Sequence, residues 1–270
     1  MVSPFLKGCA GRKKCYYMAM TPDRVPFGYQ EVTPEEKRKL VSEQFDSVAR
    51  TYDRADAVLS AGLDERWRRR GIRLLGLKAG DSVLDLCGGT GDFAVLAAAG
   101  TRPQGRVVIY DFNRRMMEAG QDKIRLSPDA RRILCVQGDA ESISFAGRSF
   151  DAVTLGFGLR NFVHPELGLE EVHRILRPGG RLLVLEFSLP EGRGLRSLYH
   201  FYSFRVMPLF ARLVSGTAGP YRYLAESIRV FPPPSQVAEF IGAAGFEDVH
   251  FEGVAKGLAT LYLARKAQGL

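Results

Sequence analysis

The sequence contains little cysteine and no long apolar run. Its four cysteines, Cys9, Cys15, Cys87 and Cys135, lack the spacing of a zinc site, so we expect reduced thiols and no metal. No window approaches the roughly 18 consecutive apolar residues that a membrane-spanning helix needs, and the first 20 residues lack the apolar core of a signal peptide. We therefore expect a cytoplasmic protein, with contact at the inner face of a membrane as an open alternative.

A concentrated block of one charge is also missing. The net charge is +8, but the 38 Lys and Arg are scattered and cluster only at residues 12–14 and 66–70. A basic surplus suits an anionic partner. Because no nucleic-acid-binding motif accompanies the charge, we expect lipid headgroups and no nucleic acid. We expect residues 66–70 to form a solvated helix face, and contact with lipid is the alternative.

What the sequence does have is an alternation of short apolar runs with helix-length segments. Its 270 residues are long enough for one core with additions. This pattern predicts an α/β fold with a mostly parallel sheet of seven strands and helices on both faces. Ligands of such sheets bind at the carboxyl ends of the strands. The predicted strands are residues 82–86, 106–110, 132–136, 150–155, 181–187, 248–252 and 258–264.

The segments around this alternation differ in character. Residues 1–32 lack periodicity, so we expect a flexible extension. Thr33 is a good N-cap, followed by Pro34 and by Glu36 three residues on, and it opens a predicted helical cap over residues 33–78. Residues 33–270 then form a single domain, with a donor-binding core at 79–187, an aromatic lid at 188–235, and a closing helix and strands at 236–268.

A glycine turn carries the first chemical signal. Gly89 and Gly91 follow an apolar run and fit the dinucleotide fingerprint G-x-G-x-x-G/A, which is weak by itself. In an NAD site an anionic pyrophosphate occupies the helix N-terminus, where the carboxylates of Asp85 and Asp92 would repel it. S-adenosylmethionine carries an ammonium and a cationic sulfonium, which the same carboxylates attract. We therefore expect this methyl donor rather than NAD.

Acidic residues also follow the next two predicted strands. Asp111 ends the second strand, where a carboxylate can accept hydrogen bonds from both ribose hydroxyls. Asp139 follows the third strand and can accept from the adenine amine, while Ala140 leaves room for the ring. Each acid alone is equally well explained as a loop carboxylate or a helix cap. Chance does not easily explain three acids, Asp85, Asp111 and Asp139, at the ends of three successive strands.

Several motifs together resemble one family. The sequence reads FGY at residues 27–29, FDSVARTYD at 45–53, LDLCGGTG at 84–91, FGLRN at 157–161, LRPGGRLLVLEFS at 176–188, YRYLAESI at 221–228 and AAGF at 243–246. These motifs resemble the C-methyltransferases of ubiquinone and menaquinone biosynthesis, a class I S-adenosylmethionine-dependent family. The glycine motif marks only the superfamily, whereas FGLRN and YRYLAESI are much more specific.

The resemblance implies a Rossmann-like class I fold and a reduced polyprenyl quinone as methyl acceptor. It places Thr90, Asp111, Asp139 and Ala140 at donor-binding positions. Gly156 lies at another such position, where many members carry serine, so one side-chain hydrogen bond to the donor is not expected here. A homodimer or a quinone-biosynthesis complex is a further expectation.

Two stretches depart from the family pattern, both in the predicted cap. Residues 53–60 read DRADAVLS, where the family usually has Tyr-Asp followed by a Met-Asn pair. Residues 64–68 read DERWR in place of a His-Arg-x-Trp-Lys pattern. These departures leave the acceptor ring open, so demethylmenaquinol and the equivalent ubiquinone precursor both remain candidates.

Methylation of such a ring needs the acceptor phenol, whose pKa is about 10 by analogy with tyrosine, to ionise. Our hypothesis is that Arg160 and Asn161 stabilise the phenolate and position a water that takes its proton, while Tyr52 closes the site. An ionised arginine cannot be the base itself, so a water or a substrate-bound relay is required. The alternative for Arg160 is an ion pair that holds its loop.

Other functions remain open at this stage. The fingerprint alone permits an NAD-dependent oxidoreductase, and the altered cap permits a non-catalytic donor-binding scaffold subunit. Another small-molecule methyltransferase is also possible, because a fold does not fix a substrate. The aromatic lid suits either packing or a channel for an isoprenoid tail. Residues 205–214, apolar with basic interruptions, suit peripheral contact with a bilayer.

Overall fold

The structure is a computed structural model that describes residues 23–269. The expectations for residues 1–22, which include the thiols of Cys9 and Cys15 and the basic cluster at 12–14, lie outside the described residues. Cys87 and Cys135 are free thiols. Within residues 23–269 no helix has the length and apolar character needed to cross a membrane.

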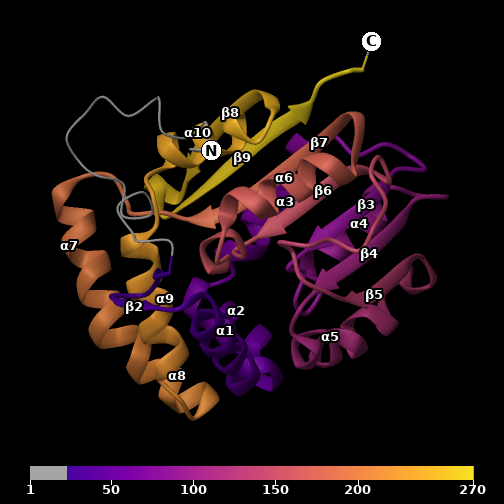
Figure 1. The fold of residues 1–270 in the computed structure, drawn as a ribbon. Helices are drawn as coiled ribbons and strands as arrows, with labels where there is room; N and C mark the ends of the chain where they lie inside the picture. Colours follow the sequence, from indigo (N-terminus) through magenta and orange to yellow (C-terminus); the bar gives the residue numbers. More distant parts are fainter. Residues whose placement is uncertain (1–22, 270) are drawn as a thin grey trace.

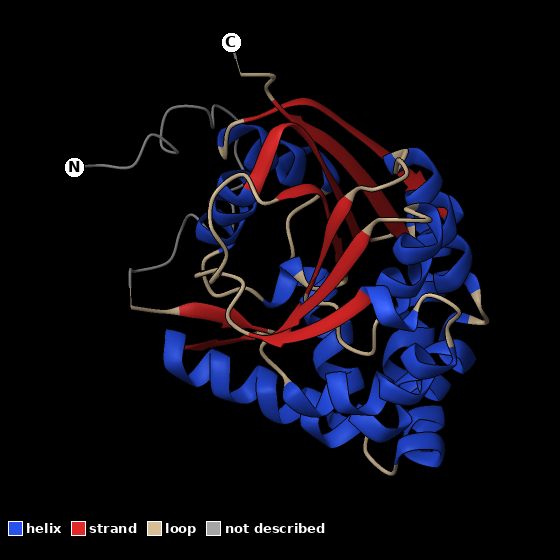
Figure 2. Cartoon of the chain, turned by 90° about the vertical axis from the view of Figure 1, so that its right-hand side faces the viewer, coloured by secondary structure: helices blue, strands red, loops and turns tan. Residues whose placement is uncertain are grey.

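A central sheet organises the molecule. In the described part of the chain the sheet has seven strands, as predicted from the apolar runs, and they pair in the order β5-β4-β3-β6-β7-β9-β8. Strands β3 to β7 run parallel to one another, and β9 runs antiparallel to both of its neighbours, β7 and the edge strand β8 (Figures 1 and 2). The strands are β3 (Ser82–Leu86), β4 (Arg106–Asp111), β5 (Ile133–Gln137), β6 (Phe150–Gly156), β7 (Leu176–Phe187), β8 (Phe246–Val254) and β9 (Ala259–Lys266).

Helices cover both faces of this sheet, as predicted. One face packs against α6 (Pro165–Ile175) and α10 (Pro234–Ala243). The other face packs against α3 (Leu63–Leu75), α4 (Asp92–Gly100) and α5 (Arg114–Leu126). The central strands are therefore apolar on both sides, which explains their nearly continuous hydrophobic sequences.

The predicted cap over residues 33–78 is wrong at its C-terminal end. Helix α3 belongs to the sheet packing, because Trp67 and Leu75 are buried in the core on that face. A Cβ atom on Gly71 would lie 2.9 Å from a methyl of Leu183, so the glycine lets the helix approach the sheet closely. Only α1 (Pro34–Val48) and α2 (Tyr52–Ser60) are left as the cap.

The same helix corrects the expectation of a solvated arginine face. Arg66, Arg69 and Arg70 are exposed, as predicted. The side chain of Arg68 is only 7% exposed and forms ion pairs with acidic residues on three helices. The sequence did not reveal this burial, because two of the three partners, Asp56 and Asp92, lie on other helices.

Helix α1 begins as the sequence predicts. The hydroxyl of Thr33 accepts a hydrogen bond from the Glu36 backbone N–H at 3.2 Å, and the Glu36 carboxylate accepts from the Thr33 N–H at 2.8 Å. This capping box satisfies two N–H groups that a helix start leaves without intrahelical partners.

The predicted lid is helical. It contains α7 (Arg193–Phe201), a π-helical turn at Tyr202–Val206, α8 (Met207–Ser215) and α9 (Gly219–Val230). These helices lie beside α1 and α2 and away from the sheet, on the side where the parallel strands end (Figure 1).

The expected flexible extension over residues 1–32 is wrong for its last part. Strands β1 (Val25–Phe27) and β2 (Gln30–Val32) pair as an antiparallel hairpin. The Phe27 ring stacks on the lid residue Tyr223, with ring centroids 4.3 Å apart. The contact is non-local, which explains why the sequence pattern did not show it.

Candidate functional site

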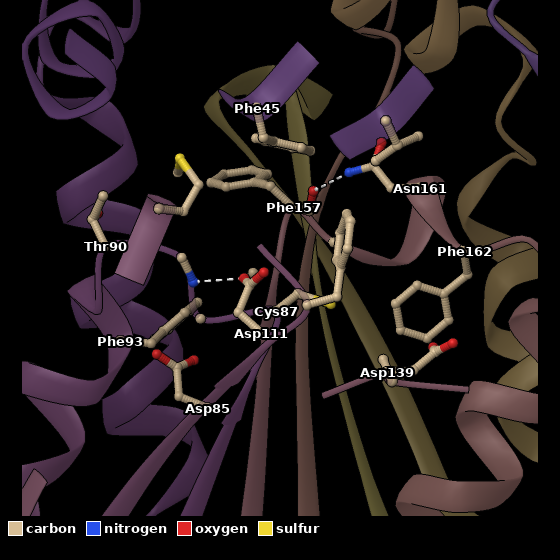
Figure 3. A pocket seen from close by; sticks show the side chains of 18 of the residues that line it. Phe45, Asp85, Cys87, Thr90, Phe93, Asp111, Asp139, Phe157, Asn161 and Phe162 are labelled. Carbon is tan, nitrogen blue, oxygen red and sulfur yellow. Dashed lines mark hydrogen bonds between the residues drawn. The ribbon is translucent and has the colours of Figure 1, made fainter. Parts of the chain in front are cut away.

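A cavity opens at the carboxyl ends of the parallel strands, where the fold predicts a ligand. It encloses about 1070 Å³, part of it open to solvent. Its lining includes most of the donor-binding residues expected from the sequence, which come from successive strand ends (Figure 3). Those residues are Asp85, Gly89, Thr90, Asp111, Asp139, Ala140 and Gly156.

The buried carboxyl of Asp85 anchors the start of α4, directly after the glycine turn. It is 1% exposed, and its two oxygens accept from the Ala94 backbone N–H at 3.0 Å and the Thr154 hydroxyl at 2.8 Å. Burial raises the pKa of this carboxyl to about 7, against the effect of these two donors. The residue therefore fixes the first turn of α4, in addition to its expected place beside the ligand.

The turn also depends on close packing. Gly91, which does not line the cavity itself, has φ +87° and caps α4, and a Cβ atom there would lie 2.8 Å from Ile109. On its other side, Gly120 of α5 touches the Thr90 backbone, where a Cβ atom would lie 2.2 Å from the carbonyl oxygen. Glycine is needed at both points for the turn to keep its place between sheet and helix.

Asp111 lies at the end of β4 and faces the turn. Its carboxylate accepts from the backbone N–H of Gly89 at 2.8 Å, drawn in Figure 3, and from that of Asn113 at 2.8 Å. Burial raises its pKa to about 6. Each oxygen keeps a second lone pair, so the residue can still accept hydrogen bonds from a ligand.

Asp139 and Ala140 border the cavity after β5. The Asp139 side chain is 48% exposed and lies 3.7 Å from the Arg38 guanidinium. One of its oxygens accepts from the Glu141 backbone N–H at 2.9 Å, which orders the loop. Ala140 is buried beside it, and its small side chain leaves space in this part of the cavity.

Asp92 and Thr90 are more strongly engaged than the sequence suggested. Asp92 pairs with Arg68 at 3.5 Å and also with Lys123. The Thr90 hydroxyl donates to Asp53 at 2.7 Å and accepts from Lys123 at 3.0 Å. Asp92 therefore does not present an uncompensated charge to a ligand. No sequence pattern indicated Lys123, whose role follows from its place on α5.

A second cavity lies between the cap and the lid. It encloses about 1580 Å³, part of it open to solvent, and most of its lining is aliphatic or aromatic. Phe45 and Tyr52 line both cavities, so the two meet at these residues. The sequence predicted an aromatic lid, but the cap residues Asp56, Leu59 and Ser60, which also line this cavity, were missed.

The proposed catalytic residues lie around this junction. Tyr52 lines both cavities, Asn161 lines the first and Arg160 lines the second. Arg160 pairs with the buried carboxylate of Glu186 at 2.6 Å and donates to the Phe157 carbonyl at 2.5 Å. Burial opposes its charge, but Glu186 raises the pKa of Arg160 above its usual value. The ion pair considered from the sequence is therefore present.

Asn161 and Tyr52 are also constrained. The Asn161 amide oxygen accepts from the Tyr223 hydroxyl at 3.0 Å, and its nitrogen lies 3.4 Å from the Phe157 carbonyl (Figure 3). Burial raises the pKa of Tyr52 far above its usual value. Tyr52 is therefore a neutral phenol at physiological pH and is no base.

Comparison with known proteins identifies the family. A model of the ubiE/COQ5 methyltransferase family matches residues 31–266. The chain belongs to this family. It is 39% identical, over 92% of its length and all of the relative's, to the "ubiquinone/menaquinone biosynthesis C-methyltransferase UbiE" of Legionella pneumophila strain Corby. It is 42% identical to the enzyme of that name in Pseudomonas putida strain F1, over 87% of this chain and 92% of the relative.

Solved structures share the fold. A Thermotoga maritima S-adenosylmethionine-dependent methyltransferase matches 83% of this chain and 98% of its own, with a TM-score of 0.56 and 21% identity. A Haemonchus contortus phosphoethanolamine N-methyltransferase in complex with S-adenosylmethionine matches 71% of this chain and 50% of its own, with a TM-score of 0.52 and 17% identity. The expected Rossmann-like class I fold is confirmed.

As a ubiE/COQ5 family member, the chain is an S-adenosylmethionine-dependent methyltransferase. The first cavity fits this donor, because it combines carboxylates for a cationic ligand with apolar walls for a nucleoside. Glycine at positions 88 and 89 brings backbone rather than side chains to the cavity surface. These features favour the methyl donor over NAD.

The family departure at Gly156 has a structural explanation. A Cβ atom on this residue would lie 2.7 Å and 2.9 Å from two ring carbons of Phe93. A serine here therefore requires the Phe93 ring to move. The glycine and the phenylalanine are complementary, because Phe93 fills the space that a side chain at position 156 would need.

The close contact of Gly120 with the donor turn predicts that Gly120→Ala weakens donor binding. The new methyl must push Thr90 away, which also destabilises the fold by about 1–3 kcal/mol. Isothermal titration with S-adenosylmethionine and urea unfolding measure the two effects. Gly194→Ala is the control, because nothing lies within 4 Å of a Cβ atom there. Unchanged affinity in Gly120→Ala contradicts the role assigned to this contact.

Proposed function

We propose that this protein transfers a methyl group from S-adenosylmethionine to a ring carbon of a reduced polyprenyl quinone precursor, either demethylmenaquinol or the equivalent ubiquinone precursor. The observation that carries the proposal is the large apolar cavity that meets the donor cavity at Phe45 and Tyr52. Its size and its aromatic lining suit a quinol ring and part of an isoprenoid tail. The names of the relatives agree with this acceptor.

The donor, when bound, supplies a methyl group on a cationic sulfonium. We assign the ribose hydroxyls to Asp111, the adenine amine to Asp139 and the space beside the ring to Ala140. Thr90, the glycine turn at Gly89 and Gly91, and Asp85 hold the donor in register. Gly156 contributes backbone only.

Around the acceptor, we assign Arg160 and Asn161 to the ring hydroxyl. Arg160 is fixed by Glu186, so it can orient the hydroxyl and favour its ionised form without side-chain rearrangement. Asn161 is fixed by Tyr223 and can hold a water near the hydroxyl. Tyr52 lies where the two cavities meet and there excludes bulk water from the reacting atoms.

The first test is product analysis. The purified protein is incubated with S-adenosylmethionine and, in separate reactions, reduced demethylmenaquinone and a reduced demethylated ubiquinone precursor. Mass spectrometry is expected to show the gain of one methyl on a ring carbon of at least one acceptor. Donor binding without methylation of either acceptor would favour the scaffold alternative or a different small-molecule acceptor.

The role of Arg160 can be separated from its ion pair. Arg160→Met alone leaves the buried charge of Glu186 without its partner and is expected to cost about 3–5 kcal/mol of folding stability. In Arg160→Met/Glu186→Gln the charge is removed, and thermal stability should largely return. Turnover of the double variant should stay about 100-fold or more below wild type, because the acceptor has lost its cation. Recovery of turnover together with stability would leave Arg160 with a structural role only.

The lid also presents an apolar surface next to the second cavity. On α7 and α8, Leu198, Phe201, Leu209, Phe210 and Leu213 are exposed. Four arginines lie on or between these helices, at positions 193, 196, 205 and 212. Apolar side chains bordered by basic ones suit an anionic bilayer surface. We propose that this surface, called the lid surface below, meets the membrane that holds the acceptor. A homodimer and a quinone-biosynthesis complex remain expectations.

Vesicle flotation tests the lid surface. The wild-type protein should float with vesicles that contain phosphatidylglycerol, and less with vesicles of phosphatidylcholine alone. Leu209→Ser/Leu213→Ser should reduce flotation without changing the melting temperature, because both residues are exposed. Leu126→Ser on α5 is the control, since Leu126 is 85% exposed but lies outside the lid. Equal flotation of all three proteins contradicts the assignment.

A further inference from the structure

A buried cluster of charges lies between the two cavities. Arg68 of α3 pairs with Asp56 of α2 at 3.2 Å and with Asp92 of α4 at 3.5 Å, both through the same guanidinium nitrogen. Its other terminal nitrogen pairs with Asp64. Arg68 and Asp92 line the donor cavity, whereas Asp56 lines the acceptor cavity. The cluster therefore connects the two sites.

The cluster has more negative than positive groups. Three carboxylates surround the single guanidinium, and among the described residues only Asp92 pairs with a further cation, Lys123. A shortage of positive charge at a buried site disfavours ionisation of the least compensated carboxylate. Asp64 has a second donor, the Ser60 hydroxyl at 2.5 Å. Asp56 is the carboxylate with the fewest partners.

Asp56 also has an available oxygen. Its Oδ2 accepts from Arg68 at 3.2 Å, while its Oδ1 accepts no hydrogen bond from any residue in the range 23–269. The side chain is 19% exposed and lines the acceptor cavity. Tyr52 lies one helical turn earlier on α2 and lines both cavities. A ring hydroxyl held near the junction therefore comes within reach of this carboxylate.

We propose that Asp56 is the catalytic base that takes the proton from the acceptor's ring hydroxyl. The inference rests on the proposed function and names the base for that same reaction. The sequence alone suggested a water or a substrate-bound relay for this step. The two stretches in which this chain departs from its family, residues 53–60 and 64–68, both contribute to the cluster. The base is therefore a feature of this chain rather than of the family pattern.

The step balances without a further reactant. The O–H bond breaks, its proton passes to Asp56, and the electron pair left on oxygen moves into the ring. A carbon–carbon bond forms to the methyl group as the methyl–sulfur bond breaks, which leaves a neutral thioether. The ring carbon then loses its hydrogen as a proton to water, and the oxygen regains a proton from Asp56. No group is oxidised or reduced.

The groups around Asp56 set its pKa near the value that a base needs at neutral pH. Burial raises its pKa to about 6, Asp64 and Asp92 add to the rise, and Arg68 opposes it. Tyr52 on its own helix stays neutral, and the face that α2 shares with α8 is formed by the apolar residues Ala55, Met207 and Ala211. Arg160 is the charged group across the cavity, already paired with Glu186. A base with this pKa is charged at neutral pH and still basic enough to accept the proton.

If Asp56 is the base, the enzyme should lose activity at acidic pH. A base must be deprotonated, so kcat of the wild-type enzyme should fall as the pH drops through about 6, the pKa of Asp56. Asp56→Asn should lower kcat by about 100-fold or more and remove this acidic limb. Asp56→Glu, which restores a carboxylate, should recover part of kcat together with the limb. The measurement is kcat against pH, at saturating S-adenosylmethionine, with the quinol that the wild type methylates.

Asp64→Asn is the matched control. Asp64 shares Arg68 with Asp56 but is absent from the lining of the acceptor cavity. Its removal takes away a negative neighbour that raises the pKa of Asp56, so the limb should persist and move to lower pH. Melting temperature and S-adenosylmethionine affinity should stay near wild type in Asp56→Asn, because Arg68 keeps Asp64 and Asp92 as partners.

An infrared titration gives a readout independent of turnover. A carboxyl band present in wild type and absent in Asp56→Asn should disappear as the pH rises through about 6. Wild-type kcat with an intact acidic limb in a folded Asp56→Asn protein would overturn the assignment of the base. A wild-type protein that binds the donor but methylates neither quinol would instead overturn the proposed function on which the inference rests.

Discussion

The donor site depends on one buried carboxylate, Asp85. Its two oxygens join three elements: its own strand β3, the neighbouring strand β6 through Thr154, and the first turn of α4 through the Ala94 N–H. A charge or a proton at this depth is tolerated only because these donors satisfy it. The bond to Ala94 holds the N-terminus of α4 directly after the glycine turn, and Asp111 holds the same turn from β4 through the Gly89 N–H. The cavity is therefore a consequence of how the sheet is tied to one helix.

The sequence was sufficient wherever the signal was local. Buried parallel strands are short apolar runs, a capping box spans four residues, and acids at strand ends meet because parallel strands end at one edge. The sequence failed where the deciding partner is distant. The helical period of α3 is visible, but that Gly71 packs on Leu183 is not. The burial of Arg68 depends on Asp92 of another helix, and the hairpin at Val25–Val32 depends on Tyr223 of the lid.

The acceptor cavity shows the same limit more strongly. Its lining comes from α1, α2, α3, the lid, the end of β7 and the short turn Leu159–Asn161 after β6, so no single stretch carries its shape. Composition indicated an aromatic lid, but not which side chains face inward. Comparison with the family shows where this chain departs from the family pattern but does not explain the departures. Packing explains one of them, because the ring of Phe93 leaves no room for a side chain at Gly156. The substitutions in α2 and α3 are similarly understandable together, because the acids and the arginine neutralise one another in part.

The two cavities differ in polarity, and the reaction needs that difference. Charges interact more strongly where water is excluded, so the sulfonium benefits from nearby carboxylates only if they are not hydrated. The apolar acceptor cavity supplies that exclusion on one side of Tyr52, and the buried carboxylates supply the negative charge on the other. Methyl transfer consumes the positive charge of the sulfonium, so the attraction that favours the donor is weaker for its neutral product. The ribose hydroxyls and the adenine amine assigned to Asp111 and Asp139 are unchanged in that product, so its release is favoured by the lost positive charge and not by these contacts.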